Sequence, residues 1–322
     1  MMLHSATPKL DFLWLELTNQ CNLQCSHCYA ESGPHAGHED TLVRSQYEAL
    51  LAEAWKIGCR RVQFIGGEPT LNHDLADLIR FAADIGYEFV EVFTNLARLP
   101  DELLACFARH HVHVATSVYA SRSGTHDLIT RVDGSFSKTV RNLRLLVEAG
   151  IPVRAGVIEM DENVGQFEQT AEFLRSIGVQ NVGRDRLRQF GRGNSTSATD
   201  LAELCGGCAE NVLCVGADGK VSPCIMSKPW FVSSVLEESL GDISSSPTLA
   251  ALRDDIRRAA VGTHEREGVH GGIHAICQPK VCGPYDTCGP KLGPGPCAPS
   301  GCSPCYPKGV WRSSPQGPTP QR

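Results

Sequence analysis

Short apolar runs alternate with amphipathic segments over residues 11–190, and this alternation limits the possible folds more than any other feature of the sequence. The apolar runs have the length of strands, and the segments between them have helical spacing, several closing on a glycine. The expected strands are 12–17, 62–64, 89–93, 112–118, 153–157 and 181–183. The expected helices are 45–57, 74–85, 101–109, 137–149 and 164–177. Six strands joined by crossover helices predict an α/β fold with a parallel sheet, whose chemistry gathers at the carboxyl ends of the strands.

Composition narrows the class of protein. With 322 residues the chain is long enough for one large domain and a smaller one. Its formal net charge of −6 gives no general attraction to nucleic acid, and no apolar run has the length of a membrane span. The first residues contain no apolar stretch typical of a secretion signal, so we expect a cytoplasmic protein with neither nucleic-acid nor membrane partners. Fifteen cysteines in a reducing compartment indicate metal binding or redox chemistry rather than disulfides.

Three of these cysteines, Cys21, Cys25 and Cys28, lie on one loop directly after the first expected strand. Thiolates are strong ligands of iron–sulfur clusters. Three ligands on one loop can hold three corners of a [4Fe–4S] cube and leave the fourth iron open for a bound molecule. The alternatives are a structural zinc site and a simple electron-transfer cluster. Zinc sites usually pair two CxxC units, and no second unit is adjacent here.

The spacing Cys21-x3-Cys25-x2-Cys28 after a first strand resembles the radical S-adenosylmethionine (SAM) superfamily. That resemblance implies a partial (β/α)6 TIM-like barrel in which the amino and carboxylate groups of SAM bind the open iron. It also implies that one electron from the reduced cluster breaks the S–C5′ bond of SAM. The products are methionine and a 5′-deoxyadenosyl radical that takes a hydrogen atom from the substrate. By the same resemblance, His27 occupies the position of an aromatic residue that packs near the adenine.

The sequence Gly66-Gly67-Glu68-Pro69 follows the second expected strand. Two glycines allow close approach of the backbone to a ligand, and Glu68 is an acceptor suited to an ammonium group. By itself such a turn is usually structural. About forty residues after the cysteine triplet, it resembles the superfamily's GGEP motif, which implies that these residues bind the methionyl amino group of SAM.

Further candidates stand near the ends of later strands. Thr94 and Asn95 end the third expected strand and Ser117 the fourth, and we take Asn95 and Ser117 as cofactor-binding candidates. The stretch HDLITRVDGSF resembles one that contacts the SAM ribose or carboxylate in related enzymes, which implicates Arg131. Arg131 could equally be a surface ion-pair residue. A charged group after the sixth strand either lines the barrel mouth near the substrate or forms an ordinary charge network: Arg184, Asp185, Arg186 and Arg188.

Two isolated cysteines, Cys59 and Cys106, fit buried apolar positions better than catalytic ones. A thiol could nevertheless serve as the hydrogen donor that a radical epimerase needs.

The character of the sequence changes after Gly193, where the residues NSTSATD resemble a linker. One helix is expected over 248–260, and Cys-X-Pro occurs six times over residues 277–308. That segment has too few large apolar residues for an ordinary core, so bound metal is the expected source of its order. We expect three parts: a radical SAM core barrel over 9–193, a small cysteine-rich, metal-binding domain over 200–308, and a disordered tail over 309–322.

The cysteines of this second part resemble a SPASM domain, an extension that carries one or two auxiliary [4Fe–4S] clusters. Cys208-x5-Cys214-x9-Cys224 matches its opening and Cys282-x5-Cys288 a later part, although the remaining spacings depart from the pattern and Cys205 is surplus. Zinc bound by the Cys-X-Pro repeats is the alternative. The resemblance implies a first cluster on Cys208, Cys214 and Cys224 completed by a residue such as Cys297. It implies a second on Cys277, Cys282 and Cys288 with Cys302 or Cys305.

The combined resemblance implies a radical SAM enzyme that matures a ribosomally synthesised peptide by cross-linking, epimerisation or oxidation. A dehydrogenase or isomerase of a small metabolite is one alternative, and a non-enzymatic iron–sulfur or zinc scaffold is another. The expected partners are a precursor peptide or a small-molecule substrate, and a flavodoxin- or ferredoxin-type electron donor. The short stretch before the first strand leaves no room for a peptide-recognition domain there, so a separate recognition protein or the C-terminal segment would bind the precursor.

Overall fold

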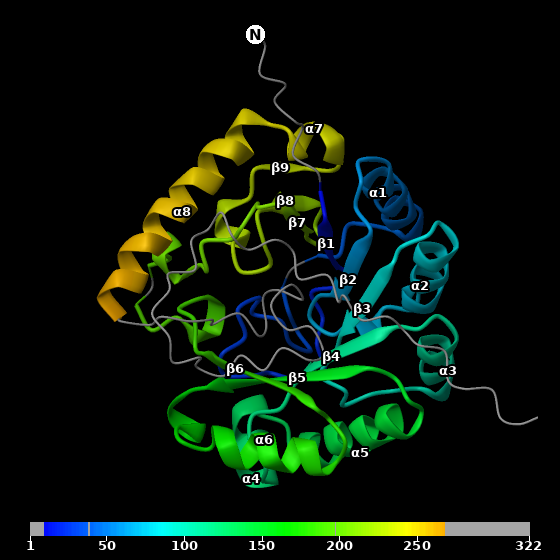
Figure 1. The fold of residues 1–322 in the computed structure, drawn as a ribbon, viewed down its shortest axis with the longest axis vertical. Coiled ribbons are helices and arrows are strands. Elements are labelled where there is room, and N and C mark those ends of the chain that lie inside the picture. Colours follow the sequence, from blue (N-terminus) through cyan, green and yellow to red (C-terminus); the bar gives the residue numbers. More distant parts are fainter. Residues whose placement is uncertain (1–9, 38, 197, 268–322) are drawn as a thin grey trace, which may run out of the picture.

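The computed structural model describes residues 10–37, 39–196 and 198–267, and a single nine-stranded sheet forms its centre (Figure 1). The strand order is β6-β5-β4-β3-β2-β1-β7-β8-β9. All pairings from β1 to β6 are parallel, which confirms the expected parallel sheet. The strands are β1 (Phe12–Glu16), β2 (Arg61–Ile65), β3 (Phe89–Phe93), β4 (His113–Ser117), β5 (Val153–Glu159), β6 (Asn181–Arg186), β7 (Val212–Val215), β8 (Lys220–Ser222) and β9 (Ser233–Ser234).

Helices connect the parallel strands and cover the outer face of the sheet, as Figure 1 shows for α1 to α6. They are α1 (Arg44–Lys56), α2 (Leu75–Asp84), α3 (Asp101–Arg109), α4 (Ser123–Thr130), α5 (Ser135–Glu148) and α6 (Phe167–Ser176). Five of these lie where the sequence predicts them. The helix α4 was not predicted, because its eight residues include few apolar positions and form only two turns.

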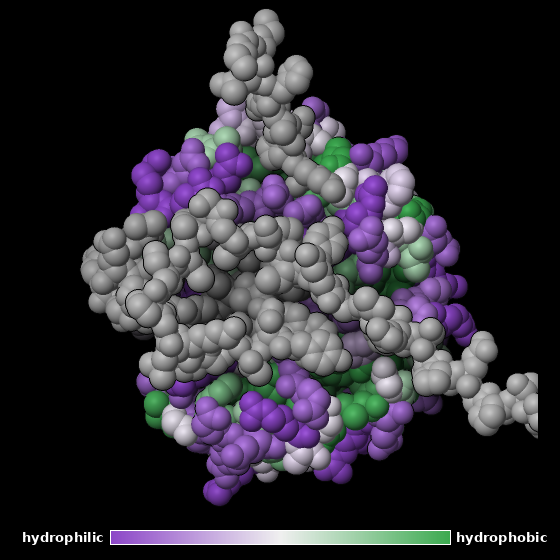
Figure 2. All heavy atoms as spheres, viewed as in Figure 1, coloured by the Kyte–Doolittle hydropathy of each residue, from purple (hydrophilic) through white to green (hydrophobic). Residues whose placement is uncertain are grey.

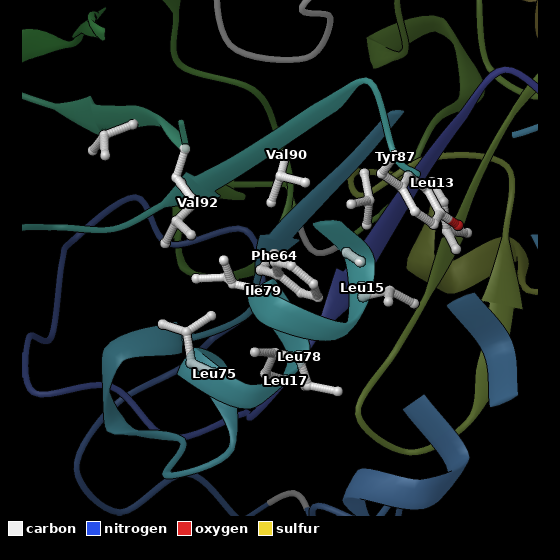
Figure 3. Packing of buried hydrophobic residues seen from close by; sticks show 14 of the residues in the cluster. Leu13, Leu15, Leu17, Phe64, Leu75, Leu78, Ile79, Tyr87, Val90 and Val92 are labelled. Atoms are coloured by element: carbon white, nitrogen blue, oxygen red, sulfur yellow. The ribbon is translucent and has the colours of Figure 1, made fainter. Parts of the chain in front are cut away.

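Strand alternation sorts the apolar side chains onto the two faces of the sheet. On the outer face, Leu13, Phe64 and Val92 belong to the main core together with residues of the covering helices. Figure 3 shows Leu75, Leu78 and Ile79 of α2 packed beside Phe64 of β2. The inner face carries a second cluster that includes residues of β1 and of the C-terminal segment. The outer core therefore packs the helices against the sheet of the barrel. The inner face of the sheet packs against residues of the C-terminal segment.

The cysteine-rich segment continues the sheet instead of standing apart from it. Strand β7 pairs with β1 in parallel register, with Phe12 opposite Val212, and β8 and β9 follow as antiparallel strands. These three strands were not predicted, because they are short and their first residues read as part of a cysteine cluster. The partial barrel and the described part of the cysteine-rich segment thus share one sheet.

Two helices follow the sheet, α7 (Leu240–Ser244) and α8 (Pro247–Glu267). The longer one begins one residue before the predicted helix 248–260 and extends beyond its end. Figure 2 shows hydrophilic side chains gathered over the upper part of α8. In the described ranges, the apolar stretches of the helices are all too short to cross a membrane.

Six cysteines with predicted ligand roles lie outside the described residues, as do all six Cys-X-Pro repeats and the tail 309–322. The roles of these cysteines stay predictions: Cys277, Cys282, Cys288, Cys297, Cys302 and Cys305.

The carboxylate of Asp127 organises the start of α5. It accepts hydrogen bonds from the backbone N–H groups of Gly134 and Phe136, each at 2.8 Å, and from the hydroxyl of Ser135 at 2.8 Å. Partial burial raises the pKa of Asp127, but these three bonds outweigh it and hold the pKa below the ordinary value of 3.8. A depressed pKa contributes stability above the ordinary value, and this contribution is lost as the pH falls through the folded-state pKa.

We therefore expect Asp127→Ala to lower the free energy of unfolding by about 1 kcal/mol at neutral pH. The difference from wild type should shrink as the pH is lowered below 3.8, and urea denaturation at a series of pH values measures it. Asp127→Asn, which cannot ionise, should show a loss at neutral pH that disappears over the same range. Equal stability of Asp127→Ala and wild type at neutral pH would contradict this assignment.

Candidate functional site

An open cavity lies at the carboxyl ends of the parallel strands, the edge at which β/α folds gather their chemistry. It encloses about 930 Å³ of space, and this volume includes open solvent at its mouth. Its walls combine the loop after β1, the loop after β2 and residues at or just after β3 to β6. Met226, from the C-terminal segment, closes one side.

All three cysteines of the N-terminal triplet border this cavity: Cys21, Cys25 and Cys28. The backbone N–H of Ser26 donates to Ile129 O at 2.9 Å, and that of Gln24 donates to Thr130 O at 3.1 Å. The cysteine loop is therefore attached to the end of α4, the helix that the sequence pattern did not reveal.

Burial makes ionisation of these thiols costly. Loss of solvation raises the pKa of Cys21 to about 12, and the nearby carboxyl group of Glu68 adds to the rise. Loss of solvation also raises the pKa of Cys25 to about 12, with repulsion from Cys28 as the next cause. Thiolates at such positions need a cationic partner, and binding of metal ions deprotonates a coordinating thiol outright.

The donor set fits a four-iron cluster. In such a cube each thiolate binds its own iron, so the three sulfurs border one space without meeting at a single point. In the described ranges, no group of three or more His, Cys, Asp or Glu side chains lies close enough together to hold a single metal ion. The three thiols, their shared cavity and their cost of ionisation therefore match the cluster that the sequence predicts.

His27 lines the same cavity, and its Nδ1 is buried without a hydrogen-bond partner in the described part of the chain. Loss of solvation lowers the pKa of His27 to about 4, and the charge of Arg192 adds to the effect, so the imidazole is neutral at physiological pH. A buried polar atom without a partner usually marks the place of a missing one. The predicted position beside a bound adenine would supply such a partner.

Tyr119 is a cavity residue that the sequence analysis missed. Its ring meets that of His27 edge to face, with centroids 4.8 Å apart. Its hydroxyl interacts with the side chains of Ser117 and Cys25, and burial raises its pKa well above the ordinary value. Its place two residues after Ser117, at the end of β4, is the signal that could have identified it.

The glycines of the GGEP segment serve a close packing of two loops. A Cβ atom on Gly67 would lie 2.2 Å from Gln20 O, and one on Gly66 would lie 2.5 Å from Thr18 O. The backbone N–H of Gly67 donates to Thr18 O at 2.7 Å, and that of Glu68 donates to Gln20 O at 2.8 Å. Both glycines also line the cavity, so the segment fixes the path of the chain into the cysteine loop as well as one wall of the site.

Glu68 is fully buried and is not among the residues that line the cavity. Its carboxylate accepts hydrogen bonds from the N–H and hydroxyl of Thr70, from the hydroxyl of Thr94 at 2.7 Å and from the N–H of Asn95 at 2.8 Å. Burial raises its pKa in spite of these bonds. The structure thus shows Glu68 joining the β2 loop to the end of β3, with Pro69 beginning the short 3-10 helix Pro69–Leu71 beside it. Direct contact of Glu68 with SAM stays a prediction.

The remaining cofactor candidates divide by position. Asn95 and Ser117 line the cavity, and the Asn95 side-chain amide donates to Cys21 Sγ at 3.6 Å and to Asn22 Oδ1 at 2.7 Å. Arg131 is exposed at the end of α4 in a left-handed conformation, with φ of 57°, and does not line the cavity. The structure brings Asn95 and Ser117 to the cysteines, while a role of Arg131 in binding SAM stays a prediction.

The charged residues after the sixth strand divide in the same way. Asp185, Arg186 and Arg188 line the cavity and also form ion pairs, Arg188 with Asp185 at 3.3 Å and Arg186 with Glu203 at 2.9 Å. Arg184 instead pairs with Glu159, and neither residue lines the cavity. Asp185, Arg186 and Arg188 therefore both line the cavity and belong to a charge network, the two roles that the sequence left open.

Other cysteines occupy two settings. Cys59 and Cys106 are buried in the outer core, as their apolar character predicts. Cys208, Cys214 and Cys224 lie together in the inner core cluster, where Cys208 Sγ is 3.0 Å from Cys224 Sγ. Contacts with the thiols of Cys205 and Cys224 raise the pKa of Cys208 well above its ordinary value. Cys205, which seemed surplus in the sequence, therefore lies with the predicted ligands.

The family model of the radical SAM superfamily matches residues 15–174. The antilisterial bacteriocin subtilosin biosynthesis protein AlbA of Bacillus subtilis (strain 168) is 27% identical over 180 residues, which cover 55% of this chain and 40% of that protein. Mycofactocin maturase MftC of Mycolicibacterium smegmatis is 32% identical over 182 residues, covering 55% and 45%. A probable GTP 3',8-cyclase of Saccharolobus solfataricus is 29% identical over 188 residues, covering 57% and 59%. The chain thus spans about half the length of the curated relatives it matches.

Solved structures share the fold. SuiB of Streptococcus suis bound to S-adenosylmethionine has a TM-score of 0.62 at 16% identity, covering 75% of this chain and 67% of that one. Native anSMEcpe with bound AdoMet has a TM-score of 0.60 at 13% identity, covering 74% and 82%. Fold, cysteine loop and family match agree: through residues 15–174, this chain belongs to the radical SAM superfamily.

Proposed function

We propose that the protein holds a [4Fe–4S] cluster on Cys21, Cys25 and Cys28, binds SAM beside it and uses SAM cleavage to abstract a hydrogen atom from a substrate. The observation that carries this proposal is the shared cavity, which three thiols of one loop border together with the buried, unpartnered Nδ1 of His27. When bound, a reduced four-iron cluster with one open iron supplies the electron that breaks the S–C5′ bond of SAM.

The chain's own residues would then bind and orient. Gly66 and Gly67 present backbone at the cavity wall, where no side chain blocks a ligand. The neutral imidazole of His27, with Tyr119 against its ring, offers a flat surface and one free polar atom to an adenine. Asn95, through its bond to Cys21 Sγ, links the end of β3 to the cluster loop. These assignments rest on position in the cavity and on the resemblance to the superfamily.

We favour a peptide substrate. Relatives named for peptide maturation support it, among them the subtilosin biosynthesis protein AlbA, a PqqA peptide cyclase and mycofactocin maturase MftC. SuiB, which shares the fold, has been solved bound to precursor peptide SuiA. On this proposal the modification is a cross-link, an epimerisation or an oxidation. A flavodoxin- or ferredoxin-type protein would supply the electron, and a separate protein would present the precursor.

A small-molecule substrate is the second candidate. Relatives of comparable identity include a probable GTP 3',8-cyclase and an AdoMet-dependent heme synthase. Asp185, Arg186 and Arg188 place both signs of charge at the cavity, a lining that a polar metabolite could also use. Comparing candidate precursor peptides with small metabolites as substrates, by mass change and by faster SAM cleavage, separates the two proposals.

One or two auxiliary [4Fe–4S] clusters complete the proposal. Cys208, Cys214 and Cys224, with Cys205 beside them, lie in the inner core cluster and would supply thiol ligands for one of these clusters. We also propose a cytoplasmic location, where thiol ligands stay reduced.

The decisive experiment is SAM cleavage by protein purified without oxygen, reconstituted with iron and sulfide and reduced with dithionite. We expect wild type to form 5′-deoxyadenosine, and Cys25→Ala to lose both the SAM-responsive cluster signal and the product. Cys106→Ala, which changes a cysteine of the outer core, is the matched control and should keep both. Product formation by Cys25→Ala at the wild-type rate would remove the ligand assignment. Absence of cleavage by wild type would favour a non-enzymatic scaffold.

A further inference from the structure

The segment Gly191–Gly193, a single turn of 3-10 helix after β6, lies against the cysteine loop although it is more than 160 residues away in the sequence. The side chain of Arg192 donates from Nε to Cys25 O at 2.9 Å and from Nη2 to Ser32 O at 2.7 Å. Its backbone N–H donates to Cys28 O at 3.0 Å. One residue therefore bonds three carbonyl groups along the stretch from Cys25 to Ser32, which carries two of the three cluster thiols.

Glycine on both sides of Arg192 leaves room for this contact, and the room matters most at Gly191. A Cβ atom on Gly191 would lie 2.4 Å from Cys28 O and 2.5 Å from Tyr29 O, both backbone atoms that cannot move aside cheaply. A Cβ on Gly193 would lie 3.3 Å from His27 O. The Gly-Arg-Gly sequence thus allows two backbone segments to approach closely, with the guanidinium placed between the carbonyls of the loop.

Arg192 also brings a positive charge to the backbone of the cysteine loop. In the described ranges its guanidinium takes part in no ion pair with a carboxylate, and its hydrogen bonds go to neutral carbonyls. Its Nε lies 2.9 Å from Cys25 O and its backbone N–H lies 3.0 Å from Cys28 O, so the positive charge is held beside two residues whose thiols are predicted cluster ligands. A cation held beside the cluster thiolates stabilises a more negatively charged cluster over a less negative one.

We propose that Arg192 is a positioning residue of the iron–sulfur loop, whose forked side chain fixes the stretch from Cys25 to Ser32 and whose charge favours the reduced state of the cluster. The inference rests on the proposed function, because it presumes a cluster on the N-terminal triplet. It assigns a role in cluster reduction to a residue whose hydrogen bonds to the loop, within the described ranges, go to carbonyl groups.

The test compares three variants of the full chain, each reconstituted without oxygen: Arg192→Gln, Arg192→Lys and, as control, Arg184→Gln. Arg184 lies in the preceding strand β6, is exposed and pairs with Glu159, and neither residue lines the cavity. Two quantities are measured for the cluster whose electron paramagnetic resonance signal responds to SAM. One is the ratio of reduced to oxidised cluster at a fixed applied potential, and the other is the rate of iron loss to a chelator.

In Arg192→Gln we expect this ratio to fall at least about tenfold, which for a one-electron couple corresponds to 59 mV, and iron to be lost faster. Lysine keeps the charge but not the fork. Arg192→Lys should therefore hold the ratio near that of wild type while still losing iron faster. Arg184→Gln should match wild type in both quantities.

An unchanged ratio in Arg192→Gln, or a ratio in Arg192→Lys as low as in Arg192→Gln, would overturn the inference. Where Arg192→Gln retains no cluster, the lysine variant decides, and iron loss at the wild-type rate there would equally overturn it. A wild-type protein without any SAM-responsive cluster signal would refute the proposed function itself, and this inference with it.

Discussion

Replacing Gly67 by alanine is expected to prevent cluster assembly at the N-terminal triplet. The added Cβ would lie 2.2 Å from Gln20 O, 2.7 Å from Gln20 C and 2.9 Å from Asn19 O, all of them backbone atoms. Relief of this clash must move the chain that enters the cysteine loop, and such overpacking typically costs about 1–3 kcal/mol or more. We therefore expect a loss of about 3 kcal/mol in the free energy of unfolding, together with loss of the iron bound by Cys21, Cys25 and Cys28.

Gly124→Ala is the matched control for that change. Gly124 lies in α4, the helix that supports the cysteine loop, and a Cβ there meets nothing within 4 Å. Alanine in a helix is favoured over glycine by up to about 1 kcal/mol, so the control should be at least as stable as wild type. Iron content after reconstitution and urea denaturation of the apo-protein measure the two effects. Full iron loading by Gly67→Ala would show that the loop accommodates the methyl group.

Replacing Arg154 by methionine is expected to destabilise the fold strongly. Its guanidinium donates from Nε to Glu91 Oε1 at 2.7 Å and from Nη2 to Glu91 Oε2 at 2.8 Å, and Gln63 donates to the same carboxylate. The side chain of Glu91 is only 2% exposed and that of Arg154 13%. Breaking a buried pair by removal of one partner leaves an uncompensated charge, at a cost of about 3–5 kcal/mol.

The double variant Glu91→Gln/Arg154→Met distinguishes a lost charge partner from lost packing. Because it removes both charges, it should recover a substantial part of the stability that Arg154→Met loses. Urea denaturation of wild type, both single variants and the double variant gives the coupling energy. Additive losses in the double variant would mean that the pair contributes only through packing. The result bears on the site as well, since Arg154 lies 5.8 Å from the ring of Phe93, a cavity residue.

Local pattern was sufficient to place much of the fold. The strand Phe89–Phe93 and the helix Asp101–Arg109 begin and end at the predicted residues, and the other predicted strands differ by a few residues at their ends. Buried parallel strands are continuous apolar runs and their covering helices are amphipathic, so both signals are contained in a short window of sequence. The cysteine triplet was identified for the same reason, since its three ligands lie within eight residues.

Elements whose stability comes from distant partners were missed. The helix α4 is short and weakly apolar, and its end bonds to the cysteine loop more than 100 residues earlier in the chain. Strand β7 has four residues and is specified by its pairing with β1. Both elements are too short for their apolar residues to show a clear helical or strand repeat in the sequence. Their packing and pairing partners determine them, and not their intrinsic propensity.

The sequence by itself determined the alternation of strands and helices, the position of the cysteine loop at a strand end and the residue types that suit an iron–sulfur cluster. Only the tertiary structure decided which groups surround that loop. It placed Tyr119 and Arg192 beside the cysteines, turned the Glu68 carboxylate toward Thr70, Thr94 and Asn95, and left Arg131 exposed. The physical reason is that hydrogen bonds and buried charges join residues that are far apart in the chain. The spacing of residues in the sequence does not show which of these distant residues come together in the fold.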